Sequence, residues 1–225
     1  MTLTLYFHPL ASFCHKVLVA LYENNTPFVG NIVDLADAEA RASLLSVWPV
    51  GKIPVLRDDR RNQIVPETTV IIEYLHQHYP GAIPLLPQDE AKRLEVRLWD
   101  RFFDLYVQVP MQKIVGDRLR TDNERDRRGV LDAKAALASA YDMIERQLEH
   151  QDWAVGHEFS MADCAAAPAL FYSAIVAPFA NSHPRVTAYL ERLLDRPSFS
   201  RVLAEARPYF HMFPYKEDMP ARFLH

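Results

Sequence analysis

The fold of this chain is decided by two short segments, Lys52-Ile53-Pro54-Val55-Leu56 and Val65-Pro66-Glu67-Thr68-Thr69. The apolar residues of the first segment predict a strand, and the charged stretch at 58–62 predicts a turn that leads into a return strand. Pro54 cannot donate a hydrogen bond to a neighbouring strand, so this strand is interrupted there or lies at the edge of a sheet. The second segment then opens a helix. The two segments together predict a β-hairpin that runs directly into a helix.

This hairpin and helix offer two features that can hold a small zwitterionic peptide. An extended peptide can pair with the backbone N–H and C=O of Ile53. The first N–H groups of the helix, at Glu67-Thr68, lack partners within the helix and favour an anionic group, assisted by the helix dipole. Each feature alone is typical of an ordinary edge strand or helix start. Their closeness in the sequence indicates a binding cradle.

The two segments resemble the glutathione transferase superfamily. Members carry a strand motif of Gly, Lys or Gln, Val or Ile, Pro, any residue and Leu, which is matched here from Gly51 to Leu56. They also carry an acidic residue followed by Ser or Thr at a helix start, which is matched by Glu67-Thr68. The chain resembles bacterial members whose active residue is serine or cysteine. The motifs do not assign it to one class within the superfamily. It implies an α/β thioredoxin-like N-terminal domain plus an all-α C-terminal domain, and it implies glutathione as co-substrate.

The order of predicted elements agrees with that plan. Periodicity predicts β-α-β-α-β-β-α over residues 1–79, the thioredoxin-like glutathione-binding domain. Residues 80–88 contain three prolines and no charged residue, which is typical of a linker. Residues 89–225 show no strand pattern and predict an all-helical domain.

Three features of the second half predict its helices. A long helix is predicted by an apolar stripe of helical period, and Pro110 is expected to kink or end it; the stripe consists of Leu94, Leu98, Phe102, Leu105, Tyr106 and Val109. Ser160 and Asp163 have the spacing of a capping box at a helix start. The 17 residues that follow, 164–180, carry no charge but include two prolines. This length is at the lower limit for a membrane span, so the segment is interpreted as a buried core helix.

Composition excludes several classes of function. The net charge of −4 and the absence of a basic half argue against nucleic acid as a partner. No glycine-rich phosphate loop is present, so no nucleotide cofactor is expected, and the nine histidines do not cluster at the spacing of metal ligands. Two cysteines do not form a disulfide framework, and the N-terminus lacks the pattern of a signal peptide. We expect a cytoplasmic protein with no membrane association.

The start of the first helix supplies the candidates for activating a thiol. Only a thiolate is nucleophilic, and a hydroxyl donor or a helix N-terminus favours it. In serine- and cysteine-using members the active residue usually stands at the position of Ala11. Some classes carry two adjacent serines there, so Ser12, one residue further along, is the predicted catalytic residue. Its alternative role is a helix N-cap. Tyr6 is a second candidate and is more simply interpreted as a core aromatic residue. Cys14 lies on the apolar face and is interpreted as a core residue.

The resemblance implies a role for each residue of the cradle. Thr68 and the helix amides would hold the γ-glutamyl carboxylate, and Glu67 would hold the amino group. Ile53 would pair with the cysteinyl backbone beside a cis Pro54. Lys52 would reach the glycyl carboxylate, or would simply be a solvated lysine. An apolar electrophile would occupy a pocket formed by Leu10, Tyr106, Met111 and Phe213.

The leading interpretation is a glutathione transferase, as in detoxification, that ionises the thiol of glutathione and attacks an apolar electrophile. The family pattern implies a homodimer in which Asp104 reaches the glutathione amine of the partner subunit. One alternative is a non-catalytic binding module similar to the stringent starvation protein, which Ala11 favours. Another is a glutathione-dependent isomerase or dehalogenase.

Overall fold

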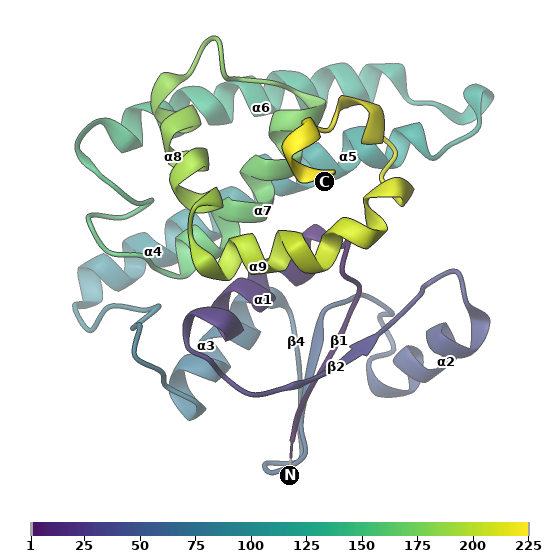
Figure 1. The fold of residues 1–225 in the computed structure, drawn as a ribbon, viewed down its shortest axis with the longest axis vertical. Helices are drawn as coiled ribbons and strands as arrows, with labels where there is room; N and C mark the ends of the chain where they lie inside the picture. Colours follow the sequence, from purple (N-terminus) through teal and green to yellow (C-terminus); the bar gives the residue numbers. More distant parts are fainter. Residues whose placement is uncertain (1, 225) are drawn as a thin grey trace.

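The N-terminal part of the protein is a four-stranded mixed sheet with helices on both sides (Figure 1). The computed structural model describes residues 2–224. The strands lie in the order β2-β1-β3-β4, with β1 parallel to β2 and antiparallel to β3, which pairs in turn with β4. Their bounds are Leu3–Phe7 for β1, Val29–Ile32 for β2, Val55–Asp58 for β3 and Gln63–Pro66 for β4.

Three helices cover this sheet and account for its buried centre. Helices α1 (Ser12–Glu23) and α3 (Thr68–His78) pack together on one side, and α2 (Ala38–Val47) lies on the other (Figure 1). Every residue of β1 is buried, as expected for a strand covered on both faces. The predicted β-α-β-α-β-β-α order and the thioredoxin-like arrangement are confirmed.

The first strand of the hairpin is offset by two residues from the predicted one, whereas the return strand begins at Gln63 as predicted. Strand β3 begins at Val55 and ends at Asp58, where the sequence predicts a strand that starts at Ile53. The reason is Pro54, which lacks the N–H that a ladder requires, so pairing begins after it. The Ile53–Pro54 peptide bond is cis, as the family resemblance implies. Ile53 therefore lies just outside the sheet, and its backbone takes no part in the ladder.

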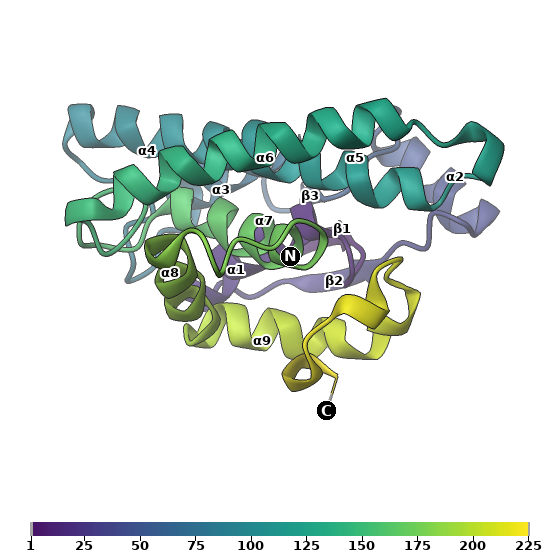
Figure 2. The same cartoon turned by 90° about the horizontal axis from the view of Figure 1, so that it is seen from above.

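The C-terminal part is entirely helical. Helix α7 forms its centre, with α4, α5 and α6 on one side and α8 and α9 on the other (Figure 2). Three short 3-10 turns follow α9 in the tail. The bounds are Glu90–Phe102 for α4, Val109–Arg118 for α5, Arg127–Gln147 for α6, Met161–Val176 for α7, Pro184–Leu194 for α8 and Pro197–Ala206 for α9.

A π-helical turn, Phe103–Gln108, joins α4 directly to α5. The chain therefore remains helical past Pro110, and the expectation that this proline could end the helix is wrong. A proline ring clashes with the carbonyl four residues earlier, here that of Tyr106. The wider π-helical turn changes the hydrogen-bonding register immediately before Pro110, and so lets the helix continue.

Most of the predicted apolar stripe is exposed, since Phe102 alone among its six residues is buried. Leu94 and Leu98 are 68% and 62% exposed, whereas Trp99 and Phe103 are buried against α7 and its neighbours. Two apolar stripes of the same helical period run along this helix, and periodicity alone does not tell which one is covered. The exposed stripe is therefore available to another surface.

Helix α7 begins with the predicted capping box. The carboxylate of Asp163 accepts a hydrogen bond of 2.8 Å from the Ser160 N–H, and it also accepts one of 2.8 Å from the Ala154 N–H. The helix is buried almost throughout, which confirms the interpretation of a core helix. Within residues 2–224, no helix is long and apolar enough to cross a membrane.

Candidate functional site

The five residues predicted to bind glutathione meet in one cavity of about 310 Å³. It lies between the segment before β3 and the start of α3, and helix α4 with the π-helical turn closes its far side. The predicted residues in its lining are Lys52, Ile53, Pro54, Glu67 and Thr68. The predicted cradle is therefore one continuous hollow in the folded chain.

Glu67 has a strained backbone at the entrance to α3. Its φ is +68° and its ψ is 122°, a region that residues other than glycine rarely adopt. Such strain persists only where the surrounding structure enforces it, and it is concentrated at functional sites. The Glu67 side chain is exposed and caps none of the helix N–H groups, whereas Thr68 is buried as the first residue of α3. The N-terminus of α3 thus remains available to a ligand.

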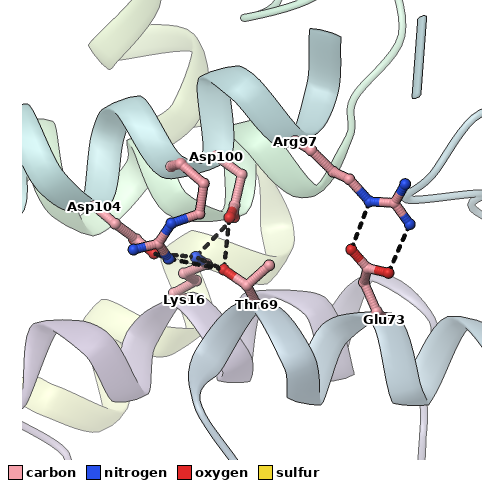
Figure 3. Close-up of polar contacts among 7 residues, drawn as sticks. Lys16, Thr69, Glu73, Arg97, Asp100 and Asp104 are labelled. Atoms are coloured by element: carbon pink, nitrogen blue, oxygen red, sulfur yellow. Dashed lines mark hydrogen bonds and ion pairs between the residues drawn. The ribbon is translucent and has the colours of Figure 1, made fainter. Parts of the chain in front are cut away.

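A buried polar cluster lies behind this cavity and connects α1, α3 and α4 (Figure 3). Lys16 Nζ lies 2.7 Å from Asp104 Oδ2 and 3.1 Å from the hydroxyl of Thr69. It also lies 2.7 Å from Asp100 Oδ1, in an ion pair that lacks hydrogen-bond geometry. The Thr69 hydroxyl donates to the other oxygen of Asp100 at 2.6 Å. Arg101 reaches Asp104 from the cavity side at 2.8 Å.

Asp104 is held within its own chain. Burial raises the pKa of its carboxyl group, and the positive charge of Lys16 opposes that rise. The sequence predicts that Asp104 reaches the ligand of a partner subunit, which stays a prediction; within its own chain its Oδ2 accepts bonds from Lys16 and Arg101. Its side chain is 4% exposed. Asp104 therefore forms part of the cavity wall and fixes it to α1.

A second ion pair joins α3 to α4 at the protein surface (Figure 3). Arg97 donates two hydrogen bonds of 2.7 Å to the carboxylate of Glu73. These bonds hold the pKa of Glu73 below its ordinary value. This bidentate pair and the buried cluster together fix the two domains on either side of the cavity.

An apolar cavity of about 370 Å³ adjoins the first one, since Gln112 lines both. Three of the four residues predicted for the electrophile pocket line it, namely Leu10, Met111 and Phe213. Tyr106 does not. It is 57% exposed and packs against the ring of Phe102, because the π-helical turn directs the next two residues inward in its place.

Ser12 lies in the wall of the apolar cavity. Ala11 occupies the N-cap position of α1, so the alternative role of Ser12 as the cap is wrong. The Ser12 hydroxyl instead accepts a hydrogen bond from Nε2 of Gln108, and both side chains are buried. Ser12 is thus the first residue of α1, next to the N–H groups at the start of the helix and facing a cavity.

The other two thiol-activating candidates lie in the core. Tyr6 packs with Val33, Leu44 and Val55 between the sheet and α2, where its hydroxyl accepts a hydrogen bond from Arg57 at 2.9 Å. Cys14 is fully buried, and burial raises the pKa of its thiol to about 12. The core interpretations of both residues are confirmed.

Sequence reasoning missed several residues of the site. Phe13, Trp48 and Arg101 line the first cavity without having been predicted there. The i,i+3 spacing of Arg101 and Asp104 is a visible signal, since residues three apart meet on a helix surface. Gln108 gives no such signal, because its inward position depends on the π-helical turn. The described part of the chain contains no group of three or more His, Cys, Asp or Glu residues placed to hold a metal ion.

Comparison with known protein families gives a consistent match to both halves of the chain. Residues 5–83 match the family model described as glutathione S-transferase, N-terminal domain. Residues 102–197 match the one described as glutathione S-transferase, C-terminal domain.

Individual relatives cover nearly the whole chain. FtsZ-localized protein A of Caulobacter vibrioides is 30% identical over 216 residues, which are 91% of this chain and 92% of that protein. A probable maleylacetoacetate isomerase of Caenorhabditis elegans is 27% identical over 206 residues, which are 91% of this chain and 94% of the relative. A glutathione S-transferase from Methylobacillus flagellatus, solved with glutathione bound, superimposes with a TM-score of 0.82 at 25% identity, covering 89% of this chain and 98% of its own.

Proposed function

The chain belongs to the glutathione transferase superfamily, and on that basis we propose that it binds glutathione between the start of β3 and the start of α3. The observation that carries this proposal is the single cavity that unites the strained Glu67, the N-terminus of α3 and the free backbone of Ile53. These three features match the two charged ends and the backbone of a γ-glutamyl tripeptide.

Each proposed contact follows from the chemistry of the residue. The first N–H groups of α3 and the Thr68 hydroxyl suit the γ-glutamyl carboxylate. The exposed carboxylate of Glu67 suits the adjacent ammonium group through a charge-assisted hydrogen bond. Ile53 offers an N–H and a C=O to the cysteinyl residue, and Lys52 offers a positive charge to the glycyl carboxylate.

We further propose that the bound thiol loses its proton to solvent and attacks an apolar electrophile in the second cavity. The thiolate would be stabilised by the hydroxyl of Ser12 and by the N-terminus of α1. Leu10, Met111 and Phe213 supply apolar surface for the electrophile. We place this reaction in the cytoplasm, an assignment that the two free, buried cysteines support.

Calorimetric titration with glutathione tests the binding site. Glu67→Ala should weaken binding about tenfold, equivalent to about 1.4 kcal/mol, because one charge-assisted bond is lost. Glu90→Ala is the matched control, since that side chain is 93% exposed and lies outside both cavities. Unchanged affinity in a folded Glu67 variant would exclude this cavity as the glutathione site.

Two other outcomes of a conjugation assay would change the assignment. Ala11, at the position where related proteins usually carry the active residue, favours a non-catalytic binding module. Binding of glutathione without formation of the thiolate or of any conjugate would support that function. The similarity to a probable maleylacetoacetate isomerase favours isomerisation, in which the thiolate adds to the substrate and is later released. Turnover without net consumption of glutathione would identify that reaction.

We also propose that two copies of the chain form a twofold dimer. The exposed leucines 94, 98 and 105, which follow α4 and the π-helical turn, support this proposal because they form an apolar stripe that faces away from the core of their own chain. Sedimentation equilibrium measures the assembly directly. A stable 25.9 kDa monomer at micromolar concentration would contradict the dimer.

A further inference from the structure

The amide side chain of Gln108 reaches from the helical domain to the first residue of α1. Its Nε2 donates to Ser12 Oγ, and the two residues are only 2% and 6% exposed. The other end of the amide, Oε1, is buried and has no partner within the described residues. Leaving a buried acceptor unsatisfied costs free energy. The one hydrogen bond that this amide makes within residues 2–224 is therefore directed at Ser12.

The π-helical turn accounts for the position of Gln108. It spans Phe103–Gln108, so Gln108 is its last residue, directly before α5. π-Helical turns inside α-helices are rare and are found frequently at functional sites. Here the turn leaves Tyr106 exposed and buries Gln108. The local geometry thus presents an amide, in place of an aromatic ring, to the start of α1.

The direction of this hydrogen bond determines what the Ser12 hydroxyl can do. A hydroxyl group has one proton to donate and two lone pairs that can accept. The bond from Gln108 occupies a lone pair, and it is the one hydrogen bond that the Ser12 side chain makes to residues 2–224. The proton of Ser12 is therefore free to donate to a group in the apolar cavity that Ser12 lines.

We propose that Gln108 is a positioning residue that holds the Ser12 hydroxyl so that its proton is directed at a thiolate in the cavity. This inference rests on the proposed function, because it requires the glutathione sulfur to lie beside Ser12. Gln108 itself need not touch glutathione. Its effect on the thiol should therefore depend entirely on the presence of the serine hydroxyl.

A double-mutant cycle on the pKa of the bound thiol tests this dependence. Thiolate absorbance in the ultraviolet is titrated against pH for glutathione bound to the wild type, Ser12→Ala, Gln108→Met and the double variant. Each single change should raise the thiol pKa by about one unit, which leaves about tenfold less thiolate at a fixed pH below the pKa. The double variant should show no larger rise than Ser12→Ala alone. Equal effects of Gln108→Met with and without Ser12 would overturn the inference.

A second variant keeps the test decisive if methionine disturbs packing. Gln108→Glu preserves the shape, and its ionised carboxylate can only accept a hydrogen bond. The Ser12 hydroxyl should then donate its hydrogen bond to this carboxylate, and the thiol pKa should rise at least as much as with methionine. Gln147→Met is the matched control, since Gln147 donates to Ala154 at 2.9 Å and lies outside both cavities. It should leave the thiol pKa unchanged.

The outcomes separate this inference from the proposed function. If the wild type binds glutathione with an ionised thiol that depends on Ser12 but not on Gln108, only the positioning role is wrong. If the thiol pKa does not respond to Ser12→Ala, both the catalytic role of Ser12 and the positioning role are wrong, whereas the binding site stands. If the wild type does not bind glutathione at all, the proposed function and this inference are both overturned.

Discussion

Replacing Lys16 with methionine should destabilise the protein strongly at neutral pH and much less in acid. Nζ of Lys16 lies 2.7 Å from an oxygen of each of Asp100 and Asp104, and all three side chains are at most 4% exposed. Methionine keeps the length and apolar stem of lysine but removes the charge. Two buried carboxylates would then face each other with only Arg101 and the Thr69 hydroxyl as polar partners.

The size of the effect follows from the burial of the cluster. Removing one partner from a buried ion pair costs about 3–5 kcal/mol, because the remaining charge stays desolvated. In a chain of this size each kcal/mol lowers the midpoint of thermal unfolding by roughly 2–4 °C, so a decrease of about 6–20 °C is expected. Even the lower end of this range is readily measured.

The pH dependence has a definite sign. Burial raises the pKa of Asp104 above its ordinary value, and the charge of Lys16 opposes that rise. A group with a raised folded-state pKa adds stability below its unfolded pKa, and this contribution is lost as the pH rises through the folded-state pKa. Without Lys16, the pKa of Asp104 should rise further. The variant should therefore regain stability as the pH falls through that raised pKa and Asp104 becomes neutral.

Urea denaturation followed by tryptophan fluorescence, at pH 7.5 and pH 5, measures both parts of the prediction. The difference between Lys16→Met and the wild type should be large at the higher pH and smaller at the lower. Lys113→Met is the matched control, because its partner Asp126 lies at the surface, and it should leave the midpoint near that of the wild type. A Lys16 variant that is as stable as the wild type at pH 7.5, or a difference that widens in acid, would refute the reasoning.

Two further predictions concern the packing of α1. Cys14 should resist alkylation in the native protein at pH 8 and react fully in denaturant, because burial raises its pKa to about 12; rapid labelling of the native thiol in a quantitative thiol assay would contradict this. Glu23→Gln should lower the free energy of unfolding by roughly 2 kcal/mol, because the buried Glu23 carboxylate accepts two bonds of 2.7 Å from Arg196 and a third from Ser198 on α9. Urea denaturation checks this loss, and an unchanged midpoint would show that α1 and α9 are held together by apolar contacts alone.

The hairpin and the cradle could be predicted because their signals are local. These signals are Pro54, the charged turn after β3 and the acidic start of α3. Each affects only the few residues around it, so the local structure can be predicted without knowing which elements pack against it. The five predicted glutathione-binding residues accordingly line one cavity. Covalent geometry and backbone hydrogen bonding determine this side of the cavity, whereas its far side depends on the packing of α4 and the π-helical turn.

The core of the helical domain could be predicted less well, because burial there depends on distant elements. Leu98 and Trp99 are adjacent and both apolar, yet one is 62% exposed and the other is 8% exposed. The packing of α4 against α7 and the π-helical turn decides between them, because it covers one face of α4. A helical period identifies an apolar stripe but not its neighbour in the fold.

The position of the predicted active hydroxyl at Ser12 rather than at residue 11 and the presence of the π-helical turn have a common explanation. Successive residues on an α-helix point about 100° apart, so a hydroxyl at Ser12 faces a different direction from one at position 11. A group that fixes this hydroxyl has to approach from the side of the helical domain. The π-helical turn before Pro110 buries Gln108 on that side and leaves Tyr106 exposed. In the proposed mechanism, thiol activation therefore depends on the backbone of the helical domain, whereas glutathione binding depends on the hairpin and α3.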